Sequence, residues 1–177
     1  CESIKLLGFT IDQDFQFKQQ TQQVLKKIGF TTKLSSLVSH FVPPPQRTCL
    51  LSSYIIPQSD YCGIILFNSS NTHFKQIVAA LQKSCKRLGV PKEAGRQAIS
   101  SLETRWISRS LCILYEIIHS EKPHLLAHHV KSIDTPSTRS CIPVRLTKAK
   151  TSIMNHSVLF KSVLCWTKLP SSFNEVK

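Results

Sequence analysis

The chain of 177 residues has room for one domain, or for one domain with an appendage. Its apolar content of 41% permits a modest core, and its formal charge of +13 makes it strongly basic. No apolar run approaches the roughly 18 residues of a membrane-spanning helix, so we expect no membrane protein. The seven cysteines are scattered, four of them inside apolar segments (Cys62, Cys85, Cys112 and Cys165), and indicate free, buried thiols in a reducing compartment, nuclear or cytoplasmic, rather than a disulfide-rich secreted domain.

The N-terminal part predicts a strand followed by a long helical region. Apolar residues alternate from Ile4 to Ile11, and Gly8 within this strand suggests a bulge or a close backbone approach. From Phe17 the apolar spacing becomes helical, and Gly29 is the position where we expect any break or bend. The prolines at 43–45 end this region, because proline donates no hydrogen bond to the helix ladder.

The clearest helix runs from about Thr72 to Leu88. Its apolar stripe comprises Phe74, Ile77, Val78, Leu81, Cys85 and Leu88. By the 100° step per residue, four basic side chains lie on the opposite face: Lys75, Lys83, Lys86 and Arg87. Asn71 is placed to cap the start of the helix, and Gly89 to end it. The basic face suits phosphate groups, although a merely solvated helix face has the same pattern.

A further helix is predicted from Ser100, where Glu103 completes a capping box. Within it, Arg105 and Arg109 stand four residues apart and repel each other, a cost that a phosphate between them would reverse. Packing of the arginine stems on Trp106 explains the pair equally well. After this helix we expect a short helix holding Leu125, Leu126 and Val130, a loop, a strand at 143–147 and a last helix at 158–166.

The positive charge is concentrated in one part of the chain. From residue 61 to 150 there are 14 Lys and Arg against 5 acidic residues. Such a field favours phosphate polymers or anionic membrane surfaces, while a solvated surface without a partner is the alternative. Charge and helix pattern together favour contact with nucleic acid.

The acidic residues are too few and too scattered for a two-metal catalytic site. Asp12 and Asp14 form the only close pair, and their place after a strand indicates a turn or a helix cap. His124 and His128 have the spacing of one helix face, but a structural zinc site needs four ligands. We therefore expect no metal, no cofactor and no catalytic residue in this chain.

Several short motifs occur in a particular order along the chain. They are Leu7-Gly8 with Asp12, Pro57 with Tyr61 and Cys62, Leu81-Gln82 with Arg87, Leu102 with Arg105, Thr138-Arg139-Ser140, and Trp166 with Leu169 and Pro170. In this order they resemble the region that follows the catalytic palm in reverse transcriptases of non-LTR retrotransposons, LINE-type elements of the jockey kind. The chain departs from the family pattern where Trp106 replaces the second Arg of "Leu-x-x-Arg-Arg" and where Thr167 replaces Asn in the last motif.

The resemblance implies the thumb and connector region of an RNA-directed DNA polymerase. The expected fold is mainly α, a helical thumb-like bundle at 13–131 between a short N-terminal β-strand at 1–12 and a small irregular C-terminal tail at 132–177. The strand at Leu7 and Gly8 would help to seat the primer end. The basic residues of the two helices, including Arg105 and Arg109, would hold the backbone of an RNA–DNA duplex.

The resemblance also separates this chain from the polymerase reaction. The "Tyr-x-Asp-Asp" palm, whose reaction needs Mg²⁺ in the parent polymerase, would precede Cys1, so the chain alone is expected to be inactive and to have the palm as a partner. The alternative is a domesticated or non-functional basic helical protein with a protein-interaction role. A salt series distinguishes the two, because phosphate contacts weaken steeply with salt.

Overall fold

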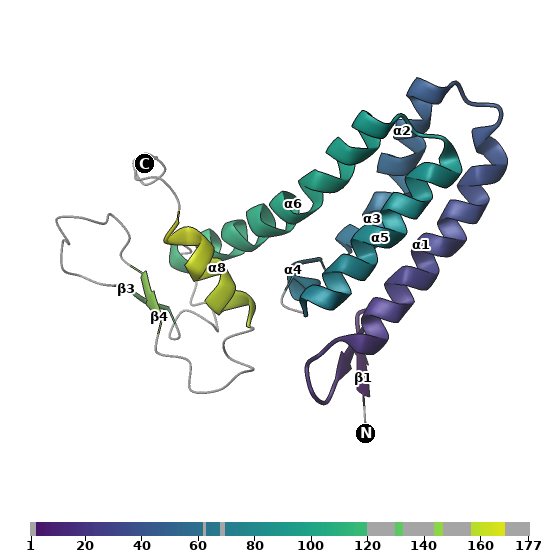
Figure 1. The fold of residues 1–177 in the computed structure, drawn as a ribbon. Helices are drawn as coiled ribbons and strands as arrows, with labels where there is room; N and C mark the ends of the chain where they lie inside the picture. Colours follow the sequence, from purple (N-terminus) through teal and green to yellow (C-terminus); the bar gives the residue numbers. More distant parts are fainter. Residues whose placement is uncertain are drawn as a thin grey trace. The chain divides into compact units, whose positions relative to one another are not determined.

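The computed structural model describes residues 3–61, 63–67, 70–119, 130–132, 144–146 and 157–168, and these are mainly helical (Figure 1). The elements in chain order are β1 (Ser3–Leu6), β2 (Phe9–Asp12), α1 (Lys18–Ser39), the 3-10 turn η1 (Pro44–Gln46), α2 (Arg47–Leu50), the π-helical turn η2 (Leu51–Ile55), α3 (Ile56–Asp60), α4 (Gly63–Leu66), α5 (Asn71–Leu88), α6 (Lys92–His119), β3 (Val130–Ser132), β4 (Val144–Leu146) and α8 (Val158–Trp166). The predicted fold class, mainly α with β structure at the N-terminus, is confirmed.

The chain forms two compact units, and the division falls inside α6. The first unit ends at Trp106, and the second begins at Ile107. The sequence placed its only domain boundaries near residues 12 and 131, so the division within a helix was not expected. The latter boundary falls in β3.

The predicted N-terminal strand is a two-stranded antiparallel hairpin. Leu6 pairs with Phe9, and the turn between them consists of Leu7 and Gly8. Both turn residues have positive φ, 48° and 80°, which is the conformation that two-residue hairpins require. Gly8 therefore marks a chain reversal rather than a bulge, because glycine adopts this backbone conformation without steric cost.

Helix α1 is continuous through Gly29, where we expected any break. Its first backbone N–H, that of Lys18, donates to Asp12 Oδ2 at 2.7 Å. This hydrogen bond confirms the predicted turn-and-cap role of Asp12, because the first N–H groups of a helix have no partner within it. The helix ends at Ser39, ahead of the prolines at 43–45.

The segment after the prolines returns through α2, η2 and α3. The helix widens to a π turn over Leu51–Ile55, which only Ile56 separates from Pro57. Proline has no N–H to donate to the preceding turn, and a local π turn accommodates that loss. Leu51 and Ile55 are fully buried and face the core of the first unit.

Helix α5 has the predicted bounds to within one residue, but its cap is Ser70 rather than Asn71. The Ser70 hydroxyl accepts the backbone N–H of His73 at 3.4 Å. Gly89 ends the helix with φ 65°, and the N–H of Val90 donates to the carbonyl of Cys85 at 3.1 Å, as in a Schellman cap.

Helix α6 begins at Lys92, eight residues before the predicted start at Ser100. The Ser100 hydroxyl donates to the carbonyl of Gln97 inside the helix, so the predicted capping box is wrong. The chain resumes helical structure directly after Pro91, whose carbonyl accepts the N–H of Gly95 at 2.9 Å.

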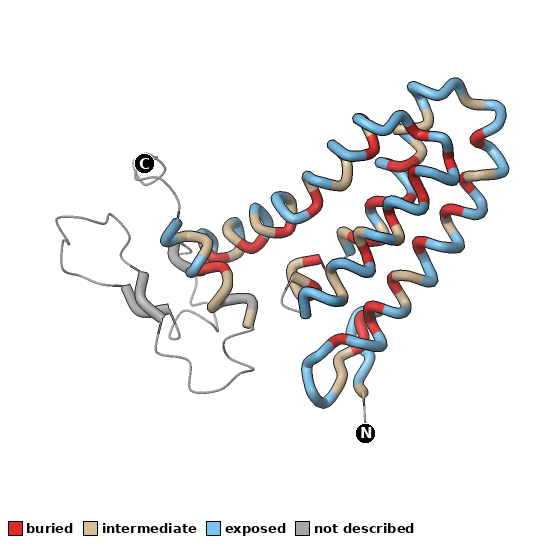
Figure 2. Tube along the Cα trace, viewed as in Figure 1, coloured by how far each residue is buried: buried red, intermediate tan, exposed pale blue. Residues whose placement is uncertain are grey.

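Trp106 lies at the centre of the core of the first unit. Its indole is fully buried, and Nε1 donates to Asp60 Oδ1 at 3.1 Å. Its ring meets Phe74 edge-on at a centroid separation of 5.6 Å. A Cβ atom on Gly63 would lie 2.6 Å from Cδ1 of this indole, so only glycine fits there. Figure 2 shows the buried positions of α5 and of the first part of α6 in red.

The second unit contains the end of α6, the β3–β4 hairpin and α8. Val130 pairs with Leu146 in an antiparallel register. The strand predicted at 143–147 and the helix predicted at 158–166 are confirmed. Val130 lies in a strand, so its predicted place in a short helix is wrong, and the rest of that predicted helix lies outside the described residues. Trp166 packs against Tyr115 with ring centroids 6.5 Å apart.

Candidate nucleic-acid interface

The exposed face of α5 carries the four basic residues that the sequence singled out. Lys75, Lys83, Lys86 and Arg87 are all exposed. At 100° per residue they fall within an arc of about 120°, and at 1.5 Å per residue they extend over about 18 Å of the helix. Phosphates of one strand recur about every 3.4 Å along a duplex axis, so the face is long enough to meet several of them. We call these four residues the α5 basic face.

The core fixes the direction of this face. Ile77 and Leu81 are fully buried on the opposite side of α5, and Leu88 is almost so. Ser84 is also buried, and its Oγ lies 2.7 Å from Thr32 Oγ1 of α1. Because rotation of α5 would expose these side chains, its basic residues are held toward solvent.

Arg47 anchors the end of the helix that carries the basic face. Its Nη1 donates to the carbonyl of Leu88 at 3.3 Å, and its Nε donates to the carbonyl of Val42 at 2.9 Å. A guanidinium at a helix C-terminus satisfies an otherwise unpaired carbonyl and complements the helix dipole. Lys86 and Arg87 lie in the last turn of α5, where the same dipole makes positive charge favourable.

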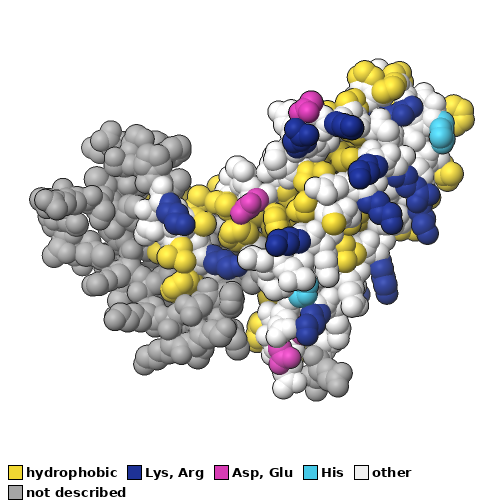
Figure 3. Space-filling model, in the orientation of Figure 1, with side chains coloured by type: hydrophobic (Ala, Val, Ile, Leu, Met, Phe, Trp, Pro, Cys, Tyr) yellow, Lys and Arg dark blue, Asp and Glu magenta, His cyan; other side chains and the backbone are white. Residues whose placement is uncertain are grey.

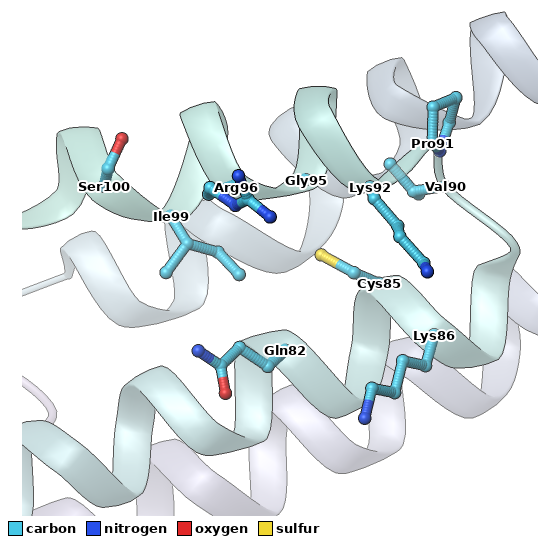
Figure 4. Close-up of a pocket in the computed structure, with 10 residues that line it drawn as sticks. All are labelled: Gln82, Cys85, Lys86, Val90, Pro91, Lys92, Gly95, Arg96, Ile99 and Ser100. Carbon is cyan, nitrogen blue, oxygen red and sulfur yellow. The ribbon is translucent and has the colours of Figure 1, made fainter.

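A pocket of about 510 Å³ opens beside the basic face, between α5 and the first turns of α6. In Figure 4, Gln82 and Ile99 approach each other from the two helices, with the Cys85 sulfur directed into the gap. Lys86, Lys92 and Arg96 contribute three cations to the residues around it. Lys92 and Arg96 were missed by the sequence reasoning, because α6 was expected to begin only at Ser100; Pro91 followed by a residue with high helix propensity was the available signal.

The surroundings of Cys85, the cysteine in this pocket, do not activate its thiol as a nucleophile. Burial raises the pKa of the Cys85 thiol, and a backbone hydrogen bond offsets this only in part. The protonated thiol is therefore favoured, whereas reactive cysteines have a lowered pKa. All the described cysteines are free thiols. Cys85 is buried as predicted, whereas the predicted burial is wrong for Cys112, which is exposed, and only partial for Cys165; Cys49 is exposed.

Arg105 is half-buried and ion-paired within the first unit. Its Nε lies 3.0 Å from Asp60 Oδ2, and Nη1 donates to the hydroxyl of Ser101. The side chains of Arg105 and Asp60 are only 30% and 12% exposed. Asp60 also accepts the indole N–H of Trp106. The network thus engages Arg105 in an ion pair that neither predicted explanation included, and it argues against a phosphate contact. Arg109 is exposed and lies in the second unit.

The hairpin tip is the other predicted contact. Leu7 is 88% exposed, and its carbonyl accepts a hydrogen bond from the Tyr61 hydroxyl. The Lys27 ammonium stands over the Tyr61 ring, 5.7 Å from its centroid. The hairpin tip is thus held by Tyr61, which follows α3 and is itself covered by Lys27 of α1.

Carboxylates are scarce in the stretch of chain that contains α5, while Glu93 lies next to it at the start of α6. Residues 15–92 contain ten Lys and Arg and a single acidic residue, Asp60, which is engaged by Arg105. Figure 3 shows Lys and Arg side chains gathered over α5 and the adjoining parts of α1 and α6. This imbalance gives the first unit a field that attracts anions.

Three other properties bear on function. In the part of the chain that the structure describes, no group of three or more His, Cys, Asp or Glu is placed to hold a metal ion. His124 and His128 lie outside that part. None of the described helices is both long and apolar enough to cross a bilayer.

Comparison with protein-family models, with curated proteins and with solved structures gives no match.

Proposed function

We propose that this chain binds the phosphate backbone of nucleic acid through the α5 basic face, as the thumb and connector region of a non-LTR retrotransposon reverse transcriptase. The proposal rests on the geometry of α5. Four exposed cations share one side of a helix whose other side is buried, in a stretch of chain with almost no carboxylates. Such contacts position a duplex without reading its sequence.

The family assignment rests on the ordered motifs, and two structural features are consistent with it. The first unit is a helical bundle that follows an N-terminal hairpin, with Leu7 and Gly8 at the hairpin tip. In the parent polymerase this tip would seat the primer end, while α5 would hold the RNA–DNA duplex. Catalysis and Mg²⁺ binding would belong to the palm, so the chain alone would not polymerise.

Lys92 and Arg96 extend the proposed contact surface beyond the sequence prediction. Both are exposed, and they share the pocket rim with Lys86 of the α5 basic face. Arg96 lies 3.4 Å from Glu93, but both partners are more than 70% exposed, so this pair is weak and can be exchanged for a phosphate. Arg105 is left out of the proposed surface because Asp60 holds it.

The test is binding of an RNA–DNA hybrid across a salt series. The double variant Lys83→Glu/Lys86→Glu removes two of the four cations, and Lys18→Glu/Lys168→Glu makes the same change of net charge elsewhere. We expect the wild-type affinity to fall by about a hundredfold between 50 and 200 mM salt, as for about four phosphate contacts. The α5 variant should lower the magnitude of the log–log salt slope by about two, and the control variant should leave it nearly unchanged.

Two results would overturn the proposal. One is no hybrid binding at 50 mM salt. The other is an equal loss in the α5 and control variants, which would mean that net charge alone attracts the hybrid.

A second candidate function, a protein-interaction role for a basic helical protein, is favoured by the large apolar side chains exposed on α1. Binding of a protein partner through those side chains would depend little on salt.

A further inference from the structure

Helix α1 exposes a row of large apolar side chains along its C-terminal half and the turn after it. The row consists of Phe30, Leu34, Leu37, Val38 and Phe41, which we call the α1 stripe. Each side chain is at least 50% exposed, and Phe41 reaches 88%. Single exposed leucines are ordinary, but a contiguous apolar row on a helix marks an interaction site. Figure 2 shows the outer edge of α1 as exposed.

In the C-terminal half of α1, the side opposite to the stripe is polar, and it is the side that packs. Thr32, Ser35 and Ser39 are buried, and Thr32 Oγ1 both donates to the carbonyl of Ile28 and meets Ser84 of α5. These small side chains let α1 and α5 approach closely. If α1 were rotated to bury the stripe, leucine and phenylalanine side chains would have to fit into the contact with α5, where only small side chains now lie. The stripe is therefore not a core-facing row in this arrangement of the two helices.

The spacing of the stripe is that of a coiled-coil seam. Within the helix, Phe30, Leu34 and Leu37 follow one another at intervals of four and three residues, the alternation of d and a positions in a heptad, and Phe41 continues this sequence spacing in the turn after the helix. In this register the g positions of α1 are Lys26 and Lys33, both of them exposed. In parallel coiled coils, g residues pair with the e residues of the partner helix and select it by charge.

The charges around the stripe define its partner. Residues 15–59 contain no acidic residue, so a second copy of the stripe would offer no carboxylate to Lys26 or Lys33. A nucleic acid would leave the apolar row uncovered. We propose that the α1 stripe docks one amphipathic helix of a protein partner, with an apolar seam of the leucine-zipper kind and acidic residues along the edge that faces Lys26 and Lys33.

This docking surface is independent of the proposed nucleic-acid contact. By the 100° step per residue, the stripe lies nearly opposite to the row of Thr32, Ser35 and Ser39 that contacts α5. A partner on the stripe therefore leaves the α5 basic face open. The two proposals can fail separately.

The test uses the whole chain and two synthetic helical peptides of about three heptads, both with leucine at a and d positions. One peptide has glutamate at its e and g positions, and the other has lysine there. Titration calorimetry should show binding of the glutamate peptide and weaker binding of the lysine peptide by about tenfold or more. The variant Leu34→Ser/Leu37→Ser should lose about tenfold or more in affinity for the glutamate peptide.

A charge reversal separates docking from unspecific attraction. Lys26→Glu/Lys33→Glu should reverse the preference, so that the lysine peptide binds more tightly. Lys83→Glu/Lys86→Glu on α5 should leave peptide binding unchanged, while the leucine-to-serine variant should leave hybrid binding unchanged. Circular dichroism of each variant confirms that the helical fold persists.

Several outcomes would overturn the docking proposal. These are no binding of either peptide, equal binding of both, or full binding by the leucine-to-serine variant. A self-association of the chain that the same variant abolishes would instead identify a second copy as the occupant. Binding to vesicles of anionic phospholipid that exceeds peptide binding, and is lost in the same variant, would instead identify a lipid surface.

Discussion

Two neighbouring helices, α1 and α5, follow opposite rules. Helix α5 buries Ile77 and Leu81 and exposes its charged residues, as an amphipathic surface helix is expected to do. The C-terminal half of α1 buries threonine and serine and exposes phenylalanine and leucine. The two helices contact each other and have their C-terminal ends at the same end of the first unit (Figure 1). Their different burial patterns therefore do not come from different neighbours. They come from the direction of each apolar row, which faces the core in α5 and solvent in the C-terminal half of α1.

The change of face within α1 occurs around Gly29. Val24 and Ile28, in the first half, are almost fully buried. Phe30 and Leu34 each follow one of these residues by six positions, which turns the apolar row by about 120° around the helix. A break at Gly29 would have let both rows face the core, but the helix continues, and the second row points outward. An apolar row on a helix thus predicts a contact, but not whether the contact is with the core or with a partner.

Matched leucine substitutions in the two helices give the largest expected effect. Leu81→Ala should lower the free energy of unfolding by about 2–5 kcal/mol, because it leaves a cavity at a fully buried position. Leu34→Ala, at a position that is 50% exposed, should change it by no more than about 0.5 kcal/mol. Urea denaturation monitored by circular dichroism measures both. Equal losses would mean that the α1 stripe is part of the core.

The ends of the two helices provide the next effect. Gly89 ends α5 with positive φ, and a Cβ there would meet Arg47 Nη1 at 2.6 Å. Gly89→Ala should therefore destabilise the chain by about 1–2 kcal/mol, the cost of the left-handed conformation for a residue with a Cβ. Thermal unfolding measures this. An unchanged stability would show that residue 89 does not adopt the left-handed conformation. The last turn of α5, with Lys86 and Arg87, would then end differently.

The smallest effect concerns Gly29 and has the opposite sign. This residue is exposed in the middle of α1, and nothing lies within 4 Å of a Cβ built on it. Gly29→Ala should raise the free energy of unfolding by about 0.5–1 kcal/mol, because alanine loses less backbone freedom in a helix than glycine does. Urea denaturation beside wild type measures the gain. A loss of stability would indicate that α1 bends at Gly29, and the outward direction of the α1 stripe would then be in question.

Much of the fold was predictable where local signals agree with the burial pattern. The bounds of α5 and α8 follow from apolar rows that the core or the second unit does bury, together with clear ends such as Gly89. The basic face of α5 was predictable for the same reason, since the direction of its apolar row also fixes where its cations point. The π turn before Pro57 and the early start of α6 at Lys92 were not predicted, because a weak local signal at Pro91 competed with a plausible capping box at Ser100.

The candidate sites divide in the same way. The sequence identified Lys75, Lys83, Lys86 and Arg87, but it left two explanations for Arg105. The choice depends on Asp60, which is 45 residues away in the sequence and 3.0 Å away in space. Likewise, only the structure joins Lys92 and Arg96 to Lys86 around one pocket. Pairings between distant residues depend on how the helices pack, and no local spacing encodes them.

By itself, the sequence determined that this protein is mainly helical, strongly basic and equipped with one helix whose cations share a single face. These properties depend on periodicity and charge, which are local and additive along the chain. The tertiary structure decided which apolar row is buried, where the chain divides into two units, and which arginine is ion-paired with Asp60. These outcomes depend on the competition among all apolar surfaces for one core, and in α1 that competition favoured small hydroxyl side chains that let two helices approach closely.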